Sequence, residues 1–427
     1  MLARLDLRGF TGDLRAVLPR PTARGDDVAG AVGEILTAVR ERGDDAVREL
    51  TRRFDGVDLP DPVVPMGDVD AALRELDPDL RAALEFARDQ IEAWHEVQRP
   101  SELRHERAGV SVQERVVPVS RAGCYVPGGR AAYPSTVLMT AVPARVAGVP
   151  DVVCCVPAGP DGRVADVTLA AAAIAGVDAV YRIGGAQAVA ALAFGTETLR
   201  PVDVVVGPGN AYVTEAKRQL AGVVGMDSLA GPSELAVVAD GDADARLVAA
   251  DVLAQAEHGP GGRAFLVTWD ATLADRVDAA LREQLVGAAR RELAAGTLAE
   301  GGHAVIVDGP DAAIAVTNAI APEHLELHGA DAESLVGRVR NAGAVFCGAF
   351  APAAVGDYVA GVNHVLPTGG TARFASALRV DHFLKRVHVV RIDRAGLSTI
   401  APYVTALACA EGLDAHARSV RMREDGP

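Results

Sequence analysis

The stretch DAVYRIGGAQAVAALAF, residues 178–194, predicts the fold most directly. A short apolar strand over 178–183 ends at Gly184-Gly185, and a helix over 186–194 follows at once. The same order of strand and helix recurs through the surrounding region, where further strands are expected at 123–127, 151–157 and 202–206. Because strands that alternate with helices form parallel sheets covered on both faces, this region predicts an α/β domain with right-handed connections.

A second series of strands and helices begins near Glu234. Its expected strands are 234–239, 264–268, 303–307, 324–328 and 343–347. Residues 26–100 instead repeat apolar residues at the three-to-four spacing of helices. Near the C-terminus, a short strand over 386–392 precedes two final helices. The sequence therefore predicts a second parallel sheet, with helical segments before and after the two sheets.

The composition excludes several classes of partner. The chain has 427 residues and a net charge of −15, so it repels nucleic acid and anionic membranes. No apolar run reaches the roughly 18 residues of a membrane-spanning helix, and the first residues, MLARLDLRGFTGDLR, lack an apolar signal-peptide core. The five cysteines form no CxxC pair and are expected to be reduced and mostly buried. These features predict a cytoplasmic protein.

Lysine is rare in this chain. Only Lys217 and Lys385 occur among 42 basic residues. A bias of the genome toward arginine codons explains this most simply. A specific need for a compact ammonium group at the two positions is the alternative.

Three strand-to-helix turns carry glycines, at 128–129, 184–185 and 207–209. Such turns let backbone N–H groups and a helix N-terminus approach an anion. None has the GxGxxG spacing, so each alone favours a tight turn over a phosphate site. Beside them, a ring and two amides could contact a nucleotide: Tyr125, Gln187 and Asn210. The residues alone leave a dinucleotide site and a set of plain turns as equal alternatives.

Several metal-binding residue types lie at the expected ends of helices or in loops. Gln255 and His258 are three apart near a helix end, so both can face one ion. Asp357 follows the last strand of the second sheet. Glu411 and His416 flank a corner at which one helix should stop near Gly412 and Asp414 should cap the next. Amide, imidazole and carboxylate ligands suit a divalent metal of zinc type, although each segment alone fits a solvated helix end or turn.

Glu323 and His324 lie at the start of an expected strand, after Pro322. A neutral imidazole is the natural general base near pH 7, and the adjacent carboxylate could activate water. The alternative is a structural histidine in the core beside a solvated glutamate. Asn363-His364 is a similar pair, but the following Val365-Leu366-Pro367 suggests structural use. The remaining histidines show no partner pattern and are treated as background: His95, His105, His303, His328, His382 and His388.

Eight long segments make the chain resemble the histidinol dehydrogenase family. They run in order as YVPGGRAAYPSTVLMTAVPARVAGV (125–149), GGAQAVAALAFGT (184–196), VVVGPGNAYVTEAKRQ (204–219), GPSELAVVAD (231–240), VLAQAEHGP (252–260), NAIAPEHLEL (318–327), GDYVAGVNHVLPT (356–368) and AEGLDAH (410–416). The chain departs from the family pattern at Gly261-Gly262-Arg263 and Gly369-Gly370, which carry no ligand in that pattern. A chance match of this length is negligible.

The resemblance implies an α/β fold of two intertwined Rossmann-like parallel-sheet domains, with a helical N-terminal arm and a helical C-terminal tail. The expected N-terminal arm covers 1–20, and the expected C-terminal tail covers 379–427. Between them, a first, discontinuous domain over 21–122 and 234–378 carries the metal and acid/base residues. A second domain over 123–233 binds NAD. The resemblance also implies a homodimer with shared active sites, in which each tail completes the site of the partner.

The family's activity is the NAD- and zinc-dependent four-electron oxidation of L-histidinol to L-histidine through L-histidinaldehyde. By resemblance, Glu323 and His324 are the catalytic acid/base pair. One zinc ion per subunit is expected on Gln255, His258, Asp357 and His416. Substrate is expected to contact these four ligands and Ser233, His324 and Glu411, and NAD to contact Tyr125, Gln187 and Asn210. The alternatives are a zinc/NAD dehydrogenase for another amino alcohol, a two-lobed binding protein without catalysis, and a zinc hydrolase.

Overall fold

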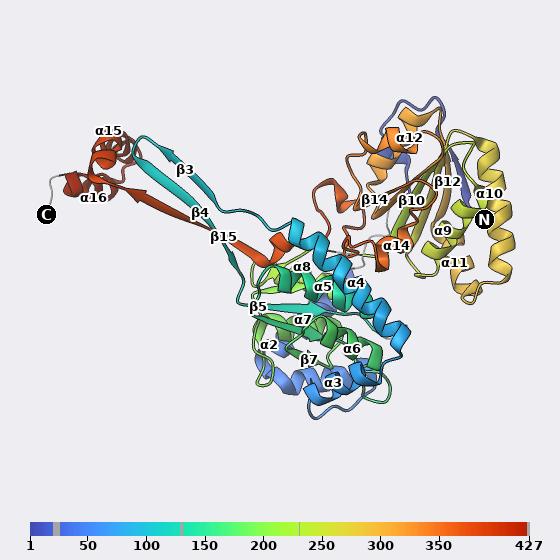
Figure 1. Cartoon of the computed structure of the whole chain (residues 1–427), viewed down its shortest axis with the longest axis horizontal. Coiled ribbons are helices and arrows are strands. Elements are labelled where there is room, and N and C mark those ends of the chain that lie inside the picture. Colours follow the sequence, from blue (N-terminus) through green and yellow to red (C-terminus); the bar gives the residue numbers. More distant parts are fainter. Residues whose placement is uncertain (20–25, 129–130, 230, 425–427) are drawn as a thin grey trace.

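The computed structural model describes residues 1–19, 26–128, 131–229 and 231–424. Figure 1 shows two lobes, each built around a sheet, and a long arm that leaves them. We call lobe I the part formed by residues 26–97 and 121–226, and lobe II the part formed by 1–18 and 231–366. The arm consists of 103–118 and 384–424. Because the chain starts in lobe II, passes through lobe I and returns, the two lobes are intertwined, and the predicted α/β fold class is confirmed.

Lobe I contains a six-stranded sheet. Its strands are β2 (Val63–Val64), β5 (Arg121–Tyr125), β6 (Asp151–Cys155), β7 (Ala179–Tyr181), β8 (Val204–Val206) and β9 (Gly225–Met226), in the order β2-β7-β6-β5-β8-β9. All neighbours pair in parallel except β2, which is antiparallel to β7. The strand and helix expected within 178–194 are therefore present.

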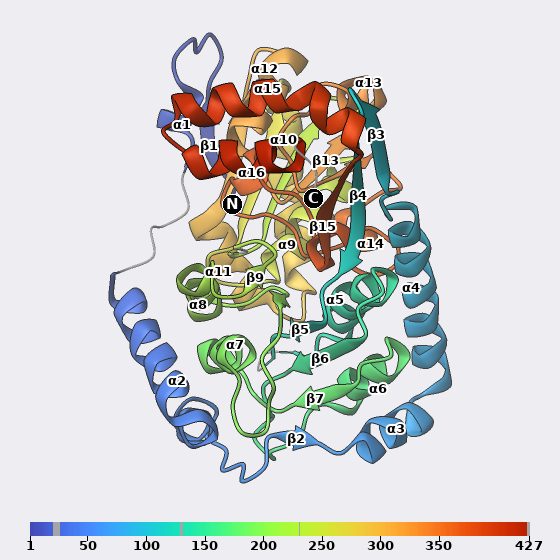
Figure 2. The same ribbon diagram turned by 90° about the vertical axis from the view of Figure 1, so that its left-hand side faces the viewer.

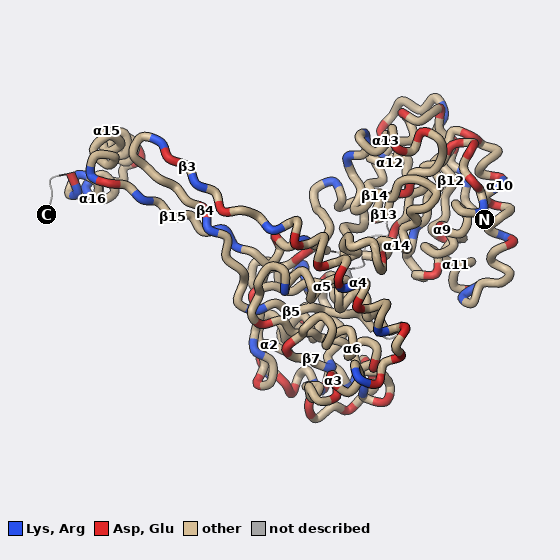
Figure 3. The backbone as a smooth tube through the Cα atoms, viewed as in Figure 1, with Lys and Arg blue, Asp and Glu red and all other residues tan. Residues whose placement is uncertain are grey.

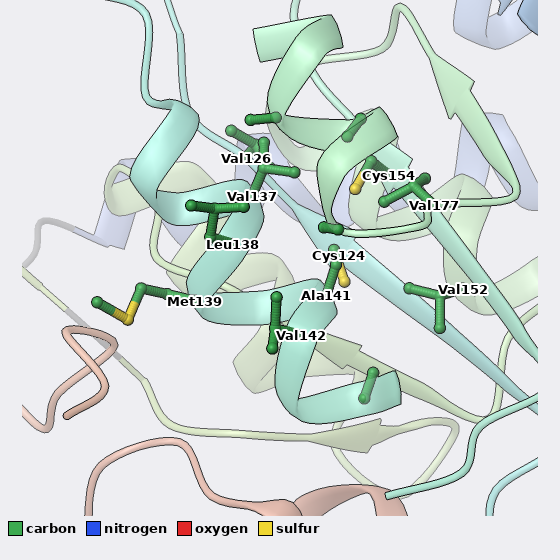
Figure 4. Packing of buried hydrophobic residues seen from close by; sticks show 14 of the residues in the cluster. Cys124, Val126, Val137, Leu138, Met139, Ala141, Val142, Val152, Cys154 and Val177 are labelled. Carbon is green, nitrogen blue, oxygen red and sulfur yellow. The ribbon is translucent and has the colours of Figure 1, made fainter. Parts of the chain in front are cut away.

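Helices cover both faces of this sheet. They are α2 (Asp26–Asp55), α3 (Met66–Glu75), α4 (Pro78–Val97), α5 (Pro134–Val146), α6 (Asp166–Ile174), α7 (Gly185–Phe194) and α8 (Ala211–Leu220). On one face, α5 and α6 contact the strands, with α4 and α3 packed outside them; on the other, α7 and α8 lie beneath α2. Figure 4 shows Leu138, Met139 and Val142 of α5 among the residues packed in one of these aliphatic cores.

Lobe II contains a second six-stranded sheet, in which every pair of neighbours is parallel. Its strands are β1 (Ala3–Asp6), β10 (Glu234–Ala239), β11 (Arg263–Thr268), β12 (Gly302–Ile306), β13 (His324–His328) and β14 (Ala344–Cys347), in the order β1-β12-β11-β10-β13-β14. One face packs against α9 (Ala245–Ala256), α10 (Ala271–Val286) and α11 (Arg291–Gly301). The other packs against α1 (Leu14–Val17), α12 (Pro310–Ile320) and α13 (Ala332–Val336). Figure 2 shows the two lobes one above the other.

The arm is an antiparallel sheet with a helical end. It comprises β3 (Leu103–Arg107), β4 (Val110–Pro118) and β15 (Leu384–Ile392) in the order β15-β4-β3, followed by α15 (Arg394–Ala410) and α16 (Asp414–Glu424). Between lobe II and β15 lie two short 3-10 turns, η1 (Thr371–Arg373) and η2 (Val380–Phe383). In Figure 1 the helical end lies far from both lobes of its own chain.

The expected domain grouping differs from the structure in three places, the first being that β3 and β4, expected within the first domain, form the arm with β15. Residues 26–97 were grouped with 234–378. In the structure their helices bury their apolar faces in lobe I instead: α2 packs against α7 and α8, α3 against α6, and α4 against α5. Residues 1–20 were expected to be a helical arm, but Ala3–Asp6 pairs with β12 at the edge of the lobe II sheet. An amphipathic pattern shows that a helix buries one face and does not show against which sheet, so the grouping required the three-dimensional structure. The expected boundary at residues 20 and 21 lies outside the described residues.

Two predictions from composition can be compared with the structure. Among the described residues, no helix is both long enough and apolar enough to cross a membrane. All five cysteines are free. Cys124, Cys154 and Cys155 are buried as expected, Cys347 is half-buried and Cys409 is exposed.

Candidate active site

The predicted acid/base pair lies at the amino end of one strand of lobe II, β13 (His324–His328), and Ser233 lies at the amino end of the neighbouring strand. Glu323 immediately precedes β13, which begins at His324, and Ser233 immediately precedes β10, which pairs with β13. Gln255 is in the last turn of α9, which packs on the same sheet. Asp357 was expected in a loop, but it lies in the last turn of α14 (Ala353–Tyr358). Side chains from four separate segments therefore converge at the end of the sheet where β10 and β13 begin.

Glu323 and His324 are buried and face each other. Glu323 Oε2 accepts the backbone N–H of Glu234 at 2.9 Å and lies 3.5 Å from His324 Nδ1. Burial raises the pKa of the Glu323 carboxyl. Burial lowers the pKa of His324, but the carboxylates of Glu323 and Asp357 outweigh this effect and raise that pKa to about 9. The imidazole thus lies between two acidic groups.

Asp357 connects His324 to other imidazoles. Its Oδ1 lies 3.5 Å from His324 Nε2. Burial raises the pKa of Asp357, but the hydrogen bond from His324 and the charges of His364 and His258 lower it overall. His364 Nδ1 lies 3.0 Å from the Asp357 carbonyl oxygen, and its Nε2 lies 3.2 Å from Thr136 Oγ1 on α5 of lobe I. His364 was considered structural from the sequence, yet it joins the site to the other lobe.

The remaining expected ligands of lobe II are near the same pair. Ser233 Oγ donates to Gln255 Oε1 at 3.2 Å, and Ser233 also hydrogen-bonds Glu323. His258 Nδ1 lies 3.2 Å from the Gln255 carbonyl oxygen, which leaves the other ring nitrogen for a ligand. Gln255 Nε2 and His324 Nδ1 are buried without a hydrogen-bond partner. This cluster of side chains therefore has polar atoms left free to bind a ligand, and its amide, imidazole and carboxylate donors fit a metal of zinc type.

The structure does not bring Glu411 and His416 to this pocket within one chain. Both are exposed at the corner between α15 and α16, at the far end of the arm (Figure 1). The corner itself is as expected, because α15 ends at Ala410, Gly412 adopts φ 71° and α16 begins at Asp414. A set of ligands that includes His416 thus requires a second copy of the chain.

The three expected nucleotide contacts lie at the carboxyl ends of the lobe I strands. Tyr125 ends β5, and its hydroxyl accepts the backbone N–H of Gly185 at 3.1 Å. Burial raises the pKa of Tyr125, whose ring packs in the core instead of standing free for stacking. Gln187 is buried in the first turn of α7 with Nε2 unpartnered. Asn210 caps α8 by accepting the N–H groups of Tyr212 and Val213 at 3.0 and 3.1 Å. Gly129, part of the first glycine turn, lies outside the described residues.

Lys217 fixes the third glycine turn. Its ammonium group is buried and donates to Gly207 O and to Asp227 Oδ1, both at 2.5 Å, while Asp227 Oδ2 accepts the Gly207 N–H at 2.7 Å. Gly207 has φ 118°, and a Cβ there would lie 2.1 Å from the Tyr125 carbonyl oxygen. A compact ammonium group at 217 is therefore used structurally. Lys385 lies exposed on β15 of the arm.

A second group of ionisable side chains lies farther along the same strand. Asp251 on α9 and Glu326 and His328 on β13 offer ligand atoms within 4.8 Å of one another. His328 was considered background from the sequence, but its Nε2 lies 3.3 Å from Glu326 Oε2 and 3.7 Å from Asp251 Oδ2. We refer to these three residues as the acid–imidazole cluster.

Comparisons with known proteins identify the family and the fold. Residues 18–424 match the family model described as histidinol dehydrogenase. The chain is 52% identical over 404 residues to histidinol dehydrogenase of Parasynechococcus marenigrum, covering 94% of this chain and 92% of that protein. It is 48% identical to the Rhizobium meliloti enzyme over 417 residues, covering 97% and 96%. The crystal structure of histidinol dehydrogenase from Elizabethkingia anophelis superposes with a TM-score of 0.93 at 33% identity, covering 99% of this chain and 98% of that one.

The two parallel-sheet lobes and these relatives define an oxidoreductase. The chain belongs to the histidinol dehydrogenase family. The family supports oxidation of histidinol in histidine biosynthesis as its activity, as the resemblance implied.

Proposed function

We propose that the chain converts L-histidinol to L-histidine through L-histidinaldehyde in two NAD-dependent oxidations, with one zinc ion per subunit. The observation that carries this proposal is the convergence of Glu323, His324 and Asp357 with the Gln255 and His258 segment at the amino edge of the lobe II sheet. The family and its named relatives support the substrate. The glycine turns of lobe I support a dinucleotide.

The side chains divide the chemistry between them. Gln255, His258 and Asp357, with His416 of a second copy of the chain, would hold zinc, which would orient the substrate and act as a Lewis acid, and bound NAD would supply the hydride acceptor. His324 accepts the proton of the substrate hydroxyl as the alcohol becomes the aldehyde; because its pKa is about 9, the neutral imidazole that this step needs becomes more abundant as the pH rises toward that value. Glu323 then takes a proton from water, whose hydroxide adds to the aldehyde carbon while protonated His324 returns its proton to the carbonyl oxygen, and this gives a gem-diol and a neutral His324. His324 accepts the hydroxyl proton of this diol in the second oxidation, which yields the carboxylate.

Residues around the pair orient it. The Glu234 N–H and Ser233 hold the Glu323 carboxylate, and Asp357 holds the opposite side of the imidazole. The pair is buried, so water reaches it only as a bound molecule, which protects the reactive aldehyde. Ser233 and Glu411 are proposed to contact the substrate, and Tyr125, Gln187 and Asn210 to contact NAD.

We also propose a homodimer in which the tail completes the partner's site. The helical end of the arm exposes large apolar side chains, with Tyr403 71%, Leu407 66% and Met422 61% exposed. Figure 3 shows Lys and Arg along β15 and α16, where they outnumber Asp and Glu, whereas the whole chain has a net charge of −15. A basic, apolar tail suits an acidic surface of a second copy. A cytoplasmic location stays a prediction.

The reaction is tested by counting reduced cofactor. Purified protein with NAD and limiting histidinol should form two NADH per histidinol, measured by absorbance. A chelator should abolish the activity, and added zinc should restore it. Other amino alcohols serve as the control for substrate choice. One NADH per substrate would contradict the second oxidation, and preference for another amino alcohol would contradict the assigned substrate.

A further inference from the structure

The acid–imidazole cluster lies on the same face of the sheet as the base. Side chains of a strand alternate between its faces, so His324, Glu326 and His328 share one face of β13. Leu325 and Leu327 face the opposite core, under α12 and α13. On α9, Asp251 is four residues before Gln255, so these two also share one face. The cluster is thus a second polar layer beside the site: Glu326 lies two residues after His324 on β13, and Asp251 lies one helical turn before Gln255 on α9.

Glu326 connects three of the segments that carry site residues. Its side chain is fully buried. Its Oε1 accepts the backbone N–H of Ala353 at 2.7 Å. Ala353 begins α14, a helix without a side-chain cap from its own N-cap residue, Pro352, and Asp357 lies in its last turn. Glu326 therefore supplies the missing cap from another element.

The other oxygen of Glu326 points toward α9. Glu326 Oε2 lies 3.3 Å from His328 Nε2, and the Glu326 side chain hydrogen-bonds Asp251. Asp251 in turn lies one helical turn before Gln255. A single buried carboxylate thus ties β13, which carries His324, to α14 and α9, which carry two of the proposed metal ligands.

The structure points to Glu326 as a positioning residue for the metal site, acting with Asp251 and His328 as a brace beneath it; this inference rests on the proposed function. The cluster itself has the composition of a cation site. However, one Glu326 oxygen caps α14, and the remaining atoms already bond one another. The brace orients ligands through their helices and does not touch substrate.

The test measures the zinc affinity of the full-length protein, first freed of metal, by competition with a coloured chelator. Glu326→Ala removes the cap and should weaken zinc binding by about 10- to 100-fold, the range for residues that support metal ligands. Glu326→Gln keeps an acceptor for the Ala353 N–H and should bind zinc nearly as the original chain does. Asp251→Ala, whose side chain is 16% exposed and so perturbs folding less, should also weaken zinc binding.

Asp240→Ala is the matched control. Asp240 is buried at the carboxyl end of β10 and accepts the N–H groups of Asp242 and Ala330 at 2.9 and 3.0 Å, away from the site. It should lower Tm without changing zinc affinity. Unchanged zinc affinity in both Glu326→Ala and Asp251→Ala would overturn the brace alone. Two zinc ions in the original chain and one in Glu326→Ala would also overturn it, since the cluster would then be a second metal site. No zinc in the original chain would overturn the proposed function and the brace with it.

Discussion

Replacing His324 by Gln should slow both oxidations by about 10²- to 10⁴-fold, the usual contribution of a general base. Gln is similar in size to His and can still hydrogen-bond, but it cannot accept a proton at neutral pH. His324 lies between Glu323 and Asp357, with one ring nitrogen 3.5 Å from each carboxylate. Steady-state rates should be measured separately with histidinol and with added histidinaldehyde.

Glu323→Gln is the control for the division of roles. The amide keeps an oxygen that can accept the Glu234 N–H, so the local structure should persist. Glu323 is proposed to act only on water, which is needed for the second oxidation alone. This variant should therefore lose more activity in oxidising added histidinaldehyde than in oxidising histidinol to the aldehyde. Equal losses on the two substrates would contradict the water-activating role and leave Glu323 as a positioning residue for His324.

Mixed dimers should recover activity that neither parent has. His324→Gln damages the pocket in lobe II, and His416→Asn damages the tail at the far end of the arm. Each mixed dimer has one intact site of two, so about half of the sites in purified mixed dimers should be active. The measurement is NADH formation by co-purified dimers that carry two different affinity tags.

The two parent homodimers, each purified alone, are the controls and should be nearly inactive. Co-expression of His324→Gln with Glu323→Gln, two changes in the same pocket, should not rescue, because every mixed dimer then lacks an intact pocket. Failure of the first pair to rescue would mean that each tail serves its own chain, which the extended arm in Figure 1 does not favour.

Much of the fold follows from local patterns. The strand–turn–helix order within 178–194 predicts β7 and α7 with small errors at their ends, because an apolar run closed by glycines is a local feature. The packing partner of α2, α3 and α4 is not local. Their apolar stripes fit either sheet, and only long-range contacts place them on lobe I. The pairing of Ala3–Asp6 with β12 spans almost 300 residues and left no signal in its own short segment.

For the candidate site too, the local motifs could be predicted from the sequence, whereas the long-range contacts between them could not. Glu323, His324, Gln255 and His258 stand in recognisable motifs, and the structure brings their segments together. The acid–imidazole cluster was missed, although two spacings could have indicated it. His324, Glu326 and His328 alternate along one strand, and Asp251 and Gln255 are one helical turn apart. Their meeting depends on α9 packing over β13, which no single segment specifies.

The most direct test is anomalous diffraction at the zinc edge from crystals of the zinc-loaded dimer. The account predicts one zinc peak per subunit, bonded at about 2.0–2.2 Å by Gln255, His258 and Asp357 of one chain and by His416 of the other. A peak held only by Asp251, Glu326 and His328, or a zinc at the first three residues with His416 of both chains remote from it, would contradict the account.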